Sequence, residues 1–373
     1  MDLIPVSRPS LGEEELASVK TVFDSGWLGL GAQVLEFEQA VGKFLGAKHV
    51  VCTNTGTTAL HLALDALGIG KGDEVIVPSF TFVATIQAIS ETGATPVFCD
   101  IQSDDLNMDI RDVRTKITLK TKVILPVHYR GIPCDMDGIL SLAQKNNLKV
   151  VEDAAHAFGS SYNGKKIGSF GDITCFSFDP IKNITCGEGG AVVFHDDSLL
   201  ERIQQKRILG IDKDTWSRYR NERSWFYDVV TQGYRYHMSN ISAAVGLIQL
   251  KKFDQMNGRK IEVAKRYDAA FDGVEGITLL RNDGYKDIGL FVYILKVKKG
   301  RNELMDYLAR KGVGSGIHYI PSHIFSFYKK DGFHLPVTEQ IYDEILTLPL
   351  FPDITDAQVE HVIDAVISGM ATK

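Results

Sequence analysis

One lysine in this sequence stands where a reactive amine would be useful. Lys182 lies in "CFSFDPIKNITCGEGGAVVF" (175–194), in the bend between two strand-like runs, and small and polar residues surround it. A lysine amine can bond covalently to a carbonyl compound and, once released, can carry protons. Most lysines in loops are only solvated surface residues, so the rest of the sequence must decide between these two interpretations.

Three further polar side chains lie at the ends of apolar runs. Asp153 ends "LKVVED" (148–153), His156 comes one helical turn later, and Ser177 precedes Lys182 by five residues. A carboxylate after a buried strand is poorly solvated unless a cation meets it, so Asp153 suits a protonated ring nitrogen. The simpler alternatives are that Asp153 caps a helix, that His156 is an ordinary hydrogen-bonded histidine and that Ser177 bonds a backbone amide.

The stretch "TNTGTTAL" (53–60) predicts an anion site at the start of a helix. Gly56 allows a tight turn, and the amides of Thr57 and Thr58 would point toward an anion at the positive helix end, although an ordinary threonine cap explains the pattern equally well. It is not a Walker loop, and "GLGAQV" (29–34) and "GIGKGD" (68–73) lack the third glycine of a dinucleotide fingerprint. Phe82, in "FTF", either packs in the core or stacks on a planar ring.

These residues belong to an α/β pattern. Apolar runs alternate with helical patterns such as 57–68 and 83–93, and the expected strands are "HVVCT" (49–53), "EVIVP" (74–78), "TPVFCD" (95–100), "KVILPV" (122–127), "LKVVED" (148–153), "DITCFSF" (172–178) and "GAVVFH" (190–195). Strands that are apolar throughout are covered on both faces, and the alternation predicts a mostly parallel sheet. Because ligands bind beyond the carboxyl ends of such strands, we expect the candidate residues to meet at one edge.

Together the candidate residues offer what one cofactor requires. Pyridoxal phosphate (PLP) needs a lysine Schiff base, an acidic partner for its pyridinium nitrogen and a phosphate site. Lys182, Asp153 and the segment around Gly56 supply these three groups, and Phe82 supplies a flat surface. The sequence therefore predicts a PLP site in which Lys182 needs space because its side chain must swing.

Length and composition set further bounds. The 373 residues suit a large domain, expected at 1–250, and a small C-terminal α+β domain, expected at 251–373. The net charge of −6 gives no support for nucleic-acid binding, and neither a membrane span nor a signal peptide is expected.

Five cysteines without a CxxC motif favour reduced thiols in the cytoplasm, and no metal site is predicted. The basic stretch 251–260 is expected to form a solvated helix face, and 211–228 an inserted loop.

The sequence also resembles a known family along nearly its whole length. The segment "VVEDAAHAFGSSYNGKKIGSFGDITCFSFDPIKNITCGEGG" (150–190) is similar to the DegT/DnrJ/EryC1/StrS sugar aminotransferases, which have the PLP-transferase type I (aspartate-aminotransferase) fold. Further similar stretches are "GWLGLGAQVLEFEQ" (26–39), "NTGTTALHLAL" (54–64), "GDEVIVPSFTFVAT" (72–85), "PVHYRGIPCDMDGI" (126–139), "GYRYHMSNISAAVGLIQL" (233–250), "GIHYIPSH" (316–323) and "LPLFP" (348–352). So long an ordered series is a specific signal.

The resemblance implies a role for each candidate residue. Lys182 matches the Schiff-base lysine, Asp153 the pyridinium partner and His156 the residue near the ring hydroxyl. Many members read "GYNYR" where this chain has "GYRYH" (233–237), and their asparagine reaches the cofactor phosphate of the neighbouring subunit, so Arg235 is implied to contact a phosphate there. The remaining matches are Ser177, Gly56 and Thr57 at the phosphate, Phe82 on the ring, and His128, His318 and Tyr319 as substrate-binding residues.

The resemblance further implies a homodimer with active sites at the interface. The implied reaction moves an amino group from L-glutamate to a nucleotide-linked keto-deoxysugar, for a surface polysaccharide or a glycosylated metabolite. The "GYRYH" segment favours a 4-keto-6-deoxy sugar, with a C3-specific enzyme as the alternative, and loops 211–228 and 315–330 are expected to set this choice. A PLP-dependent sugar dehydratase, which has histidine at the lysine position, and a non-enzymatic sensor on the same fold are less favoured.

Overall fold

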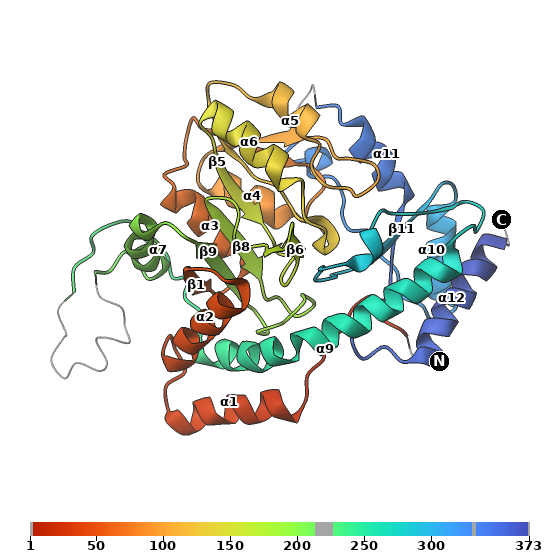
Figure 1. The fold of residues 1–373 in the computed structure, drawn as a ribbon, viewed down its shortest axis with the longest axis horizontal. Coiled ribbons are helices and arrows are strands. Elements are labelled where there is room, and N and C mark those ends of the chain that lie inside the picture. The colour runs from red at the N-terminus through yellow and green to blue at the C-terminus, as the bar shows by residue number, and fades with distance from the viewer. Residues whose placement is uncertain (1–2, 213–226, 330–332, 372–373) are drawn as a thin grey trace.

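The computed structural model describes residues 3–212, 227–329 and 333–371, and its larger part is built on a seven-stranded sheet (Figure 1). The strand order is β1-β9-β8-β5-β4-β2-β3. The strands are β1 (His49–Thr53), β2 (Glu74–Pro78), β3 (Thr95–Cys99), β4 (Thr121–Ile124), β5 (Lys149–Asp153), β8 (Ile173–Ser177) and β9 (Gly190–Phe194). All neighbouring pairs are parallel except those that β9 makes with β1 and β8. β9 is antiparallel because the chain returns from β8 through 178–189 without the crossover helix that a parallel neighbour would need.

Helices cover both faces of this sheet, which explains why its strands are apolar throughout. One face carries α3 (Gly56–Ala66), α4 (Val83–Glu91) and α7 (Leu200–Arg207). The other carries α2 (Ala32–Leu45), α5 (Ile110–Lys116), α6 (Met136–Asn146) and the first half of α9 (Asn240–Phe271), along which α1 (Glu13–Ser25) lies. Successive strand residues serve opposite layers: Val51 packs with the first and Cys52 with the second. The expected α/β class with a mostly parallel sheet is confirmed.

A smaller C-terminal part packs beside the sheet (Figure 1). Its antiparallel sheet has the order β10 (Ile277–Leu279), β11 (Tyr293–Val297), β12 (Ile345–Leu348), and its helices are α10 (Arg301–Arg310), α11 (Pro336–Glu344) and α12 (Asp356–Ala371). This is the expected α+β part, although α11 and β12 were not predicted. The remaining short elements are β6 (Ser161–Tyr162), β7 (Lys165–Lys166) and the 3₁₀ turns η1 (Tyr129–Gly131), η2 (Asp197–Leu199), η3 (Asp283–Tyr285) and η4 (Ser322–Ile324).

The long helix α9 joins the two parts. Phe253 packs in the core beneath the large sheet, whereas Tyr267 packs in the C-terminal core, which Ile4 of the N-terminal segment also joins. The division between residues 250 and 251 falls inside this helix and stays a prediction. Lys260 is only 4% exposed, so the expected solvated face of 251–260 is wrong at this residue: the helix crosses between two cores and meets protein there.

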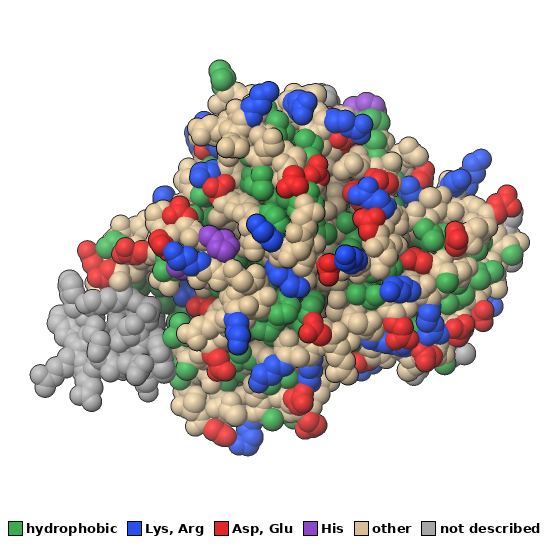
Figure 2. Space-filling view, viewed as in Figure 1, with side chains coloured by type: hydrophobic (Ala, Val, Ile, Leu, Met, Phe, Trp, Pro, Cys, Tyr) green, Lys and Arg blue, Asp and Glu red, His purple; other side chains and the backbone are tan. Residues whose placement is uncertain are grey.

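The surface mixes charges of both signs on the face that Figure 2 shows. Within the described ranges, no helix has both the length and the apolar character that crossing a bilayer requires. All five cysteines are buried free thiols. Most of the expected inserted loop 211–228 lies outside the described residues, as does residue 330 of the expected specificity loop 315–330.

Candidate active site

A cavity of about 320 Å³ lies at the carboxyl ends of β5 and β8, beside the start of α3. Parallel strands end on the same side of a sheet, so the segments that follow them meet at one edge. Nine of the eleven residues to which the family resemblance gives a role line this cavity: Gly56, Thr57, Phe82, Asp153, His156, Ser177, Lys182, His318 and Tyr319. The last two come from the C-terminal part, so the cavity lies between the two parts of the chain.

Lys182 lies in the loop between β8 and β9, with its amine at the cavity. The Nζ atom is 4.2 Å from the ring centre of Phe291. Burial lowers the pKa of Lys182 to about 8, although the carboxylates of Asp179 and Asp153 act in the opposite direction. An appreciable fraction of the amine is therefore unprotonated near neutral pH, as a nucleophile or a base requires.

Asp153 ends β5 and is 4% exposed. Its carboxylate accepts hydrogen bonds from Thr85 Oγ1 at 2.7 Å and from the backbone N–H of Ala155 at 3.0 Å. Burial raises the pKa of Asp153, while these two donors and the charge of Lys182 oppose the rise. Residues 154–160 form turns rather than a helix, so Asp153 caps no helix there, and the expected helical turn between Asp153 and His156 is absent.

Two buried threonines support the Asp153 carboxylate. Thr81 Oγ1 lies 2.8 Å from Thr85 Oγ1, and these side chains belong to residues that are 2% and 1% exposed. An ionised carboxylate can only accept hydrogen bonds, so Thr85 donates to Asp153 and accepts from Thr81. Neither threonine was predicted from the sequence, although their spacing of four residues around the start of α4 was an available signal.

The start of α3 is a capped helix N-terminus that lines the cavity. Thr55 caps the helix, and its Oγ1 accepts the N–H of Thr58 at 3.1 Å. The N–H groups of Gly56 and Thr57 belong to the first turn, where the helix itself offers them no acceptor. A Cβ atom at Gly56 would lie 2.7 Å from Ser177 Cβ, so only glycine lets α3 approach the end of β8 this closely. The threonine cap is confirmed, and because it uses the N–H of Thr58, the expectation that this amide points toward an anion is wrong. An anion site at the N–H groups of Gly56 and Thr57 stays a prediction.

Two histidines, His156 and His318, also line the cavity. His156 Nε2 is 2.9 Å from the hydroxyl of Tyr319, and the His156 ring stacks on Phe291 with the ring centres 4.2 Å apart. Burial is the main cause that lowers the pKa of His156 and brings the pKa of His318 to about 4, and the charge of Lys182 adds to both shifts. Both rings are therefore neutral near pH 7.

Phe82 lies at the rim of the cavity rather than in the core. It is 54% exposed, and its ring centre is 5.5 Å from that of Tyr319. The alternative that Phe82 is a core residue is therefore wrong. Its exposed ring is free to cover a planar group in the cavity.

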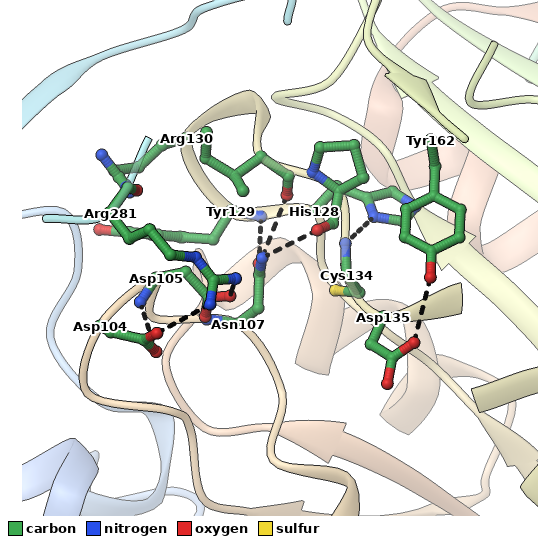
Figure 3. Close-up of polar contacts among 12 residues, drawn as sticks. Asp104, Asp105, Asn107, His128, Tyr129, Arg130, Cys134, Asp135, Tyr162 and Arg281 are labelled. Atoms are coloured by element: carbon green, nitrogen blue, oxygen red, sulfur yellow. Dashed lines mark hydrogen bonds and ion pairs between the residues drawn. The ribbon is translucent and has the colours of Figure 1, made fainter. Parts of the chain in front are cut away.

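Two of the residues named from the sequence lie outside the cavity. His128 is fully buried, and its Nε2 lies 2.8 Å from Glu152. Its Nδ1 accepts the N–H of Cys134 at 3.0 Å (Figure 3). Both ring nitrogens have protein partners, so the structure does not support substrate contact by His128. Arg235 is exposed, and its backbone pairs with Ile208; its side chain is not part of this cavity wall.

Three further residues lie beside Lys182 that were not predicted from the sequence. Asp179 and Glu188 flank Lys182 in the same loop, and burial together with the charge of Asp179 raises the pKa of Glu188. Both stand in the segment quoted around Lys182 and could have been found there. Phe291 carried no signal because it is one apolar residue within the apolar run 287–297.

Comparison with known proteins gives consistent matches over nearly the whole chain. Residues 9–367 match the model of the DegT/DnrJ/EryC1/StrS aminotransferase family. The spore coat polysaccharide biosynthesis protein SpsC of Bacillus subtilis is 42% identical over 373 residues, covering 97% of this chain and 96% of SpsC. The PLP-form of Spr1654 from Streptococcus pneumoniae is 32% identical with a TM-score of 0.91 and covers 99% of both chains. The sugar aminotransferase CalS13 from Micromonospora echinospora is 31% identical with a TM-score of 0.90, covering 98% of this chain and 100% of CalS13.

Proposed function

Because the chain belongs to the DegT/DnrJ/EryC1/StrS aminotransferase family, we propose that it transfers the amino group of L-glutamate to a nucleotide-linked 4-keto-6-deoxy sugar. The chain is a PLP-dependent sugar aminotransferase with the fold of the solved PLP aminotransferases. Its similarity to SpsC supports a role in the biosynthesis of a polysaccharide or a glycosylated metabolite.

The residues of the cavity fit PLP. Lys182 offers an amine, Asp153 a buried carboxylate that only neutral donors contact, and the start of α3 the N–H groups of its first turn. His156 Nδ1 is buried without a hydrogen-bond partner within the described ranges. These groups complement the carbonyl, ring nitrogen, phosphate and ring hydroxyl of PLP. When bound, PLP supplies an electron-accepting ring beside the amino group that is transferred.

The side chains then have separate tasks. Asp153 holds a proton at the ring nitrogen through its negative charge, and Thr85 and Ala155 keep that charge stable. The amine of Lys182 takes the proton that leaves the α-carbon of glutamate and later delivers a proton to the sugar carbon. Glutamate leaves as 2-oxoglutarate, whose keto oxygen comes from a water molecule, and the oxygen of the sugar keto group leaves as water, so no net water is consumed or released.

One observation carries the proposal: the Lys182 amine, the Asp153 carboxylate and the helix start at Gly56 converge on one cavity. A lysine at position 182 supports amino transfer over dehydration, because the dehydratases that resemble this chain have histidine there. The basic Arg235 within "GYRYH" supports amination at C4 of the sugar.

We also propose that the enzyme is a homodimer. Arg235 is exposed and lies outside the cavity of its own subunit, yet Asn54, just before the start of α3, bonds its backbone. An arginine in this place can reach the phosphate of a neighbouring subunit, where its planar guanidinium can make two parallel hydrogen bonds.

A panel of nucleotide-linked keto-sugars tests the proposed reaction. The purified PLP enzyme is mixed with L-glutamate and each sugar, and the position of the new C–N bond is read by NMR. We expect amination at C4 of a 4-keto-6-deoxy sugar, and loss of the cofactor's violet absorption when glutamate is added alone. A product aminated at C3 would refute the proposed position, and a sugar product lacking both the hydroxyl group and nitrogen would refute amino transfer.

A further inference from the structure

The amine of Lys182 rests on an aromatic face rather than on an acceptor. Its Nζ atom is 4.2 Å from the ring centre of Phe291 and, within the described part of the chain, makes no hydrogen bond and no ion pair. We propose that Phe291 is a positioning residue whose ring holds the free Lys182 ammonium in the cavity by cation–π attraction. This inference rests on the proposed function, in which the lysine must alternate between bound and free states.

The ring of Phe291 is itself held in place. Phe291 is 3% exposed, and its backbone N–H donates to the carbonyl of Arg130 at 3.0 Å. The His156 ring stacks on it at an angle of 17°, and the His318 ring stands edge-on to it at 89°. Phe291 thus brings a fixed aromatic face from the C-terminal part to the loop that carries Lys182.

An aromatic face suits a lysine that must leave its resting place. A carboxylate in hydrogen-bond contact would hold the ammonium and raise its pKa, which would weaken it as a base. Among the described residues, the groups whose charges interact with Lys182 are Asp179, Asp153, His156 and His318, and the titratable Glu188 and Tyr319 line the same cavity. The ring attracts the cation without accepting its proton, so the amine stays in place while burial keeps its pKa at about 8.

Fluorinated phenylalanines at position 291 test the contact without disturbing the packing. Each fluorine withdraws electron density from the ring face and barely changes its shape. In the full-length protein freed of PLP, the Lys182 pKa is measured from the pH dependence of acetic anhydride labelling, read by mass spectrometry of the Lys182 peptide. A weaker ring face stabilises the ammonium less, so the pKa should fall with each fluorine, and labelling at neutral pH should rise about threefold with three fluorines. A pKa that does not change across the series would overturn the proposal.

A matched pair of leucine variants separates the ring contact from general packing. Phe253, also 3% exposed, contacts the rings of Phe44 and Phe158, whereas the Lys182 amine lies over the ring of Phe291. Phe291→Leu should lower the pKa of Lys182, and Phe253→Leu should leave it unchanged. Equal shifts in both variants would mean that loosened packing is the cause and would refute the ring's role.

The holoenzyme supplies a second readout. Because the lysine acts as a base, fluorination should move the acid limb of the kcat–pH profile to lower pH and leave KM for the sugar unchanged. The labelling experiment needs no substrate, so the two proposals can fail separately. If fluorination leaves the Lys182 pKa unchanged while the enzyme still aminates the sugar, only the ring contact is refuted. If the Lys182 pKa falls with each fluorine but the protein aminates no sugar, the proposed reaction is refuted and the ring contact is supported.

Discussion

Replacing Thr85 with valine should show what one hydroxyl contributes to the charge of Asp153. Thr85 Oγ1 donates to the carboxylate at 2.7 Å, and both residues are at most 4% exposed. Valine has nearly the same shape and no donor, so Asp153 keeps only the N–H of Ala155. A hydrogen bond to a buried charge contributes about 1.5–3 kcal/mol. We expect the cofactor-free Thr85→Val protein to lose about that much free energy of unfolding at neutral pH.

The pH dependence of this loss identifies its cause. Burial raises the pKa of Asp153 above its ordinary value, and removing a donor raises the pKa further. A folded state with a raised carboxyl pKa binds a proton more readily than the unfolded chain, so its stability falls as pH rises through that pKa. The charge-dependent part of the deficit is therefore complete where Asp153 is ionised in both proteins, and it disappears in acid where both are protonated. The loss of the Thr81–Thr85 hydrogen bond remains at every pH. Urea unfolding at neutral and acidic pH measures both values.

Kinetics of the holoenzyme provide the second half of this test. If the full free energy of this hydrogen bond stabilises the transition state, its loss lowers kcat by about tenfold to a hundredfold. KM for glutamate should change little. Thr85→Ser keeps the hydroxyl and is the matched control, which should retain most of the activity. The reasoning is refuted if the serine and valine variants behave alike, or if the stability deficit of the valine variant is the same at all pH values.

Four further predictions concern the cavity and the contribution of Arg235 from the neighbouring subunit of the proposed homodimer. Lys182→Ala should fold and lose covalent PLP, and borohydride reduction with peptide mapping of the parent enzyme should place the cofactor on Lys182; label on another lysine would contradict this. Asp153→Asn should still bind PLP but lose at least about a hundredfold in kcat, because an amide cannot hold the ring proton by charge; activity within a few-fold of the parent would count against it. Gly56→Ala brings a Cβ atom to 2.7 Å from Ser177 Cβ and should weaken PLP binding about tenfold by equilibrium dialysis, whereas unchanged affinity would place the phosphate elsewhere. Mixing inactive Lys182→Ala with inactive Arg235→Ala chains should restore activity after subunit exchange, because one site of each mixed dimer is intact; no recovery would argue against a shared site.

The sequence predicted the sheet and the edge at which the cavity lies because both depend on local patterns. An apolar run ending in a polar residue marks the end of a buried strand, and Asp153, Ser177 and Gly56 each stand beside such an end. The contribution of the C-terminal part was harder to find, since Phe291 is one apolar residue among many. Phe291 meets Lys182 only through tertiary packing, so no residue pattern within 287–297 could predict this contact.

His128 follows a predicted strand, much as Asp153 and Ser177 end β5 and β8, yet it does not line the cavity. Consecutive residues of a strand point to opposite faces of the sheet, so in "VVED" the two acids Glu152 and Asp153 must point apart. Asp153 points to the side of α4, where Thr85 meets it, and Glu152 points to the other side, where His128 and Thr174 contact it. A residue at the end of a strand lies at the edge where the cavity is. Whether its side chain faces the cavity depends on the alternation of side chains between the two faces of the sheet. A shift of one residue would exchange the two acids, and only the packing of the helices fixes which of them faces the cavity.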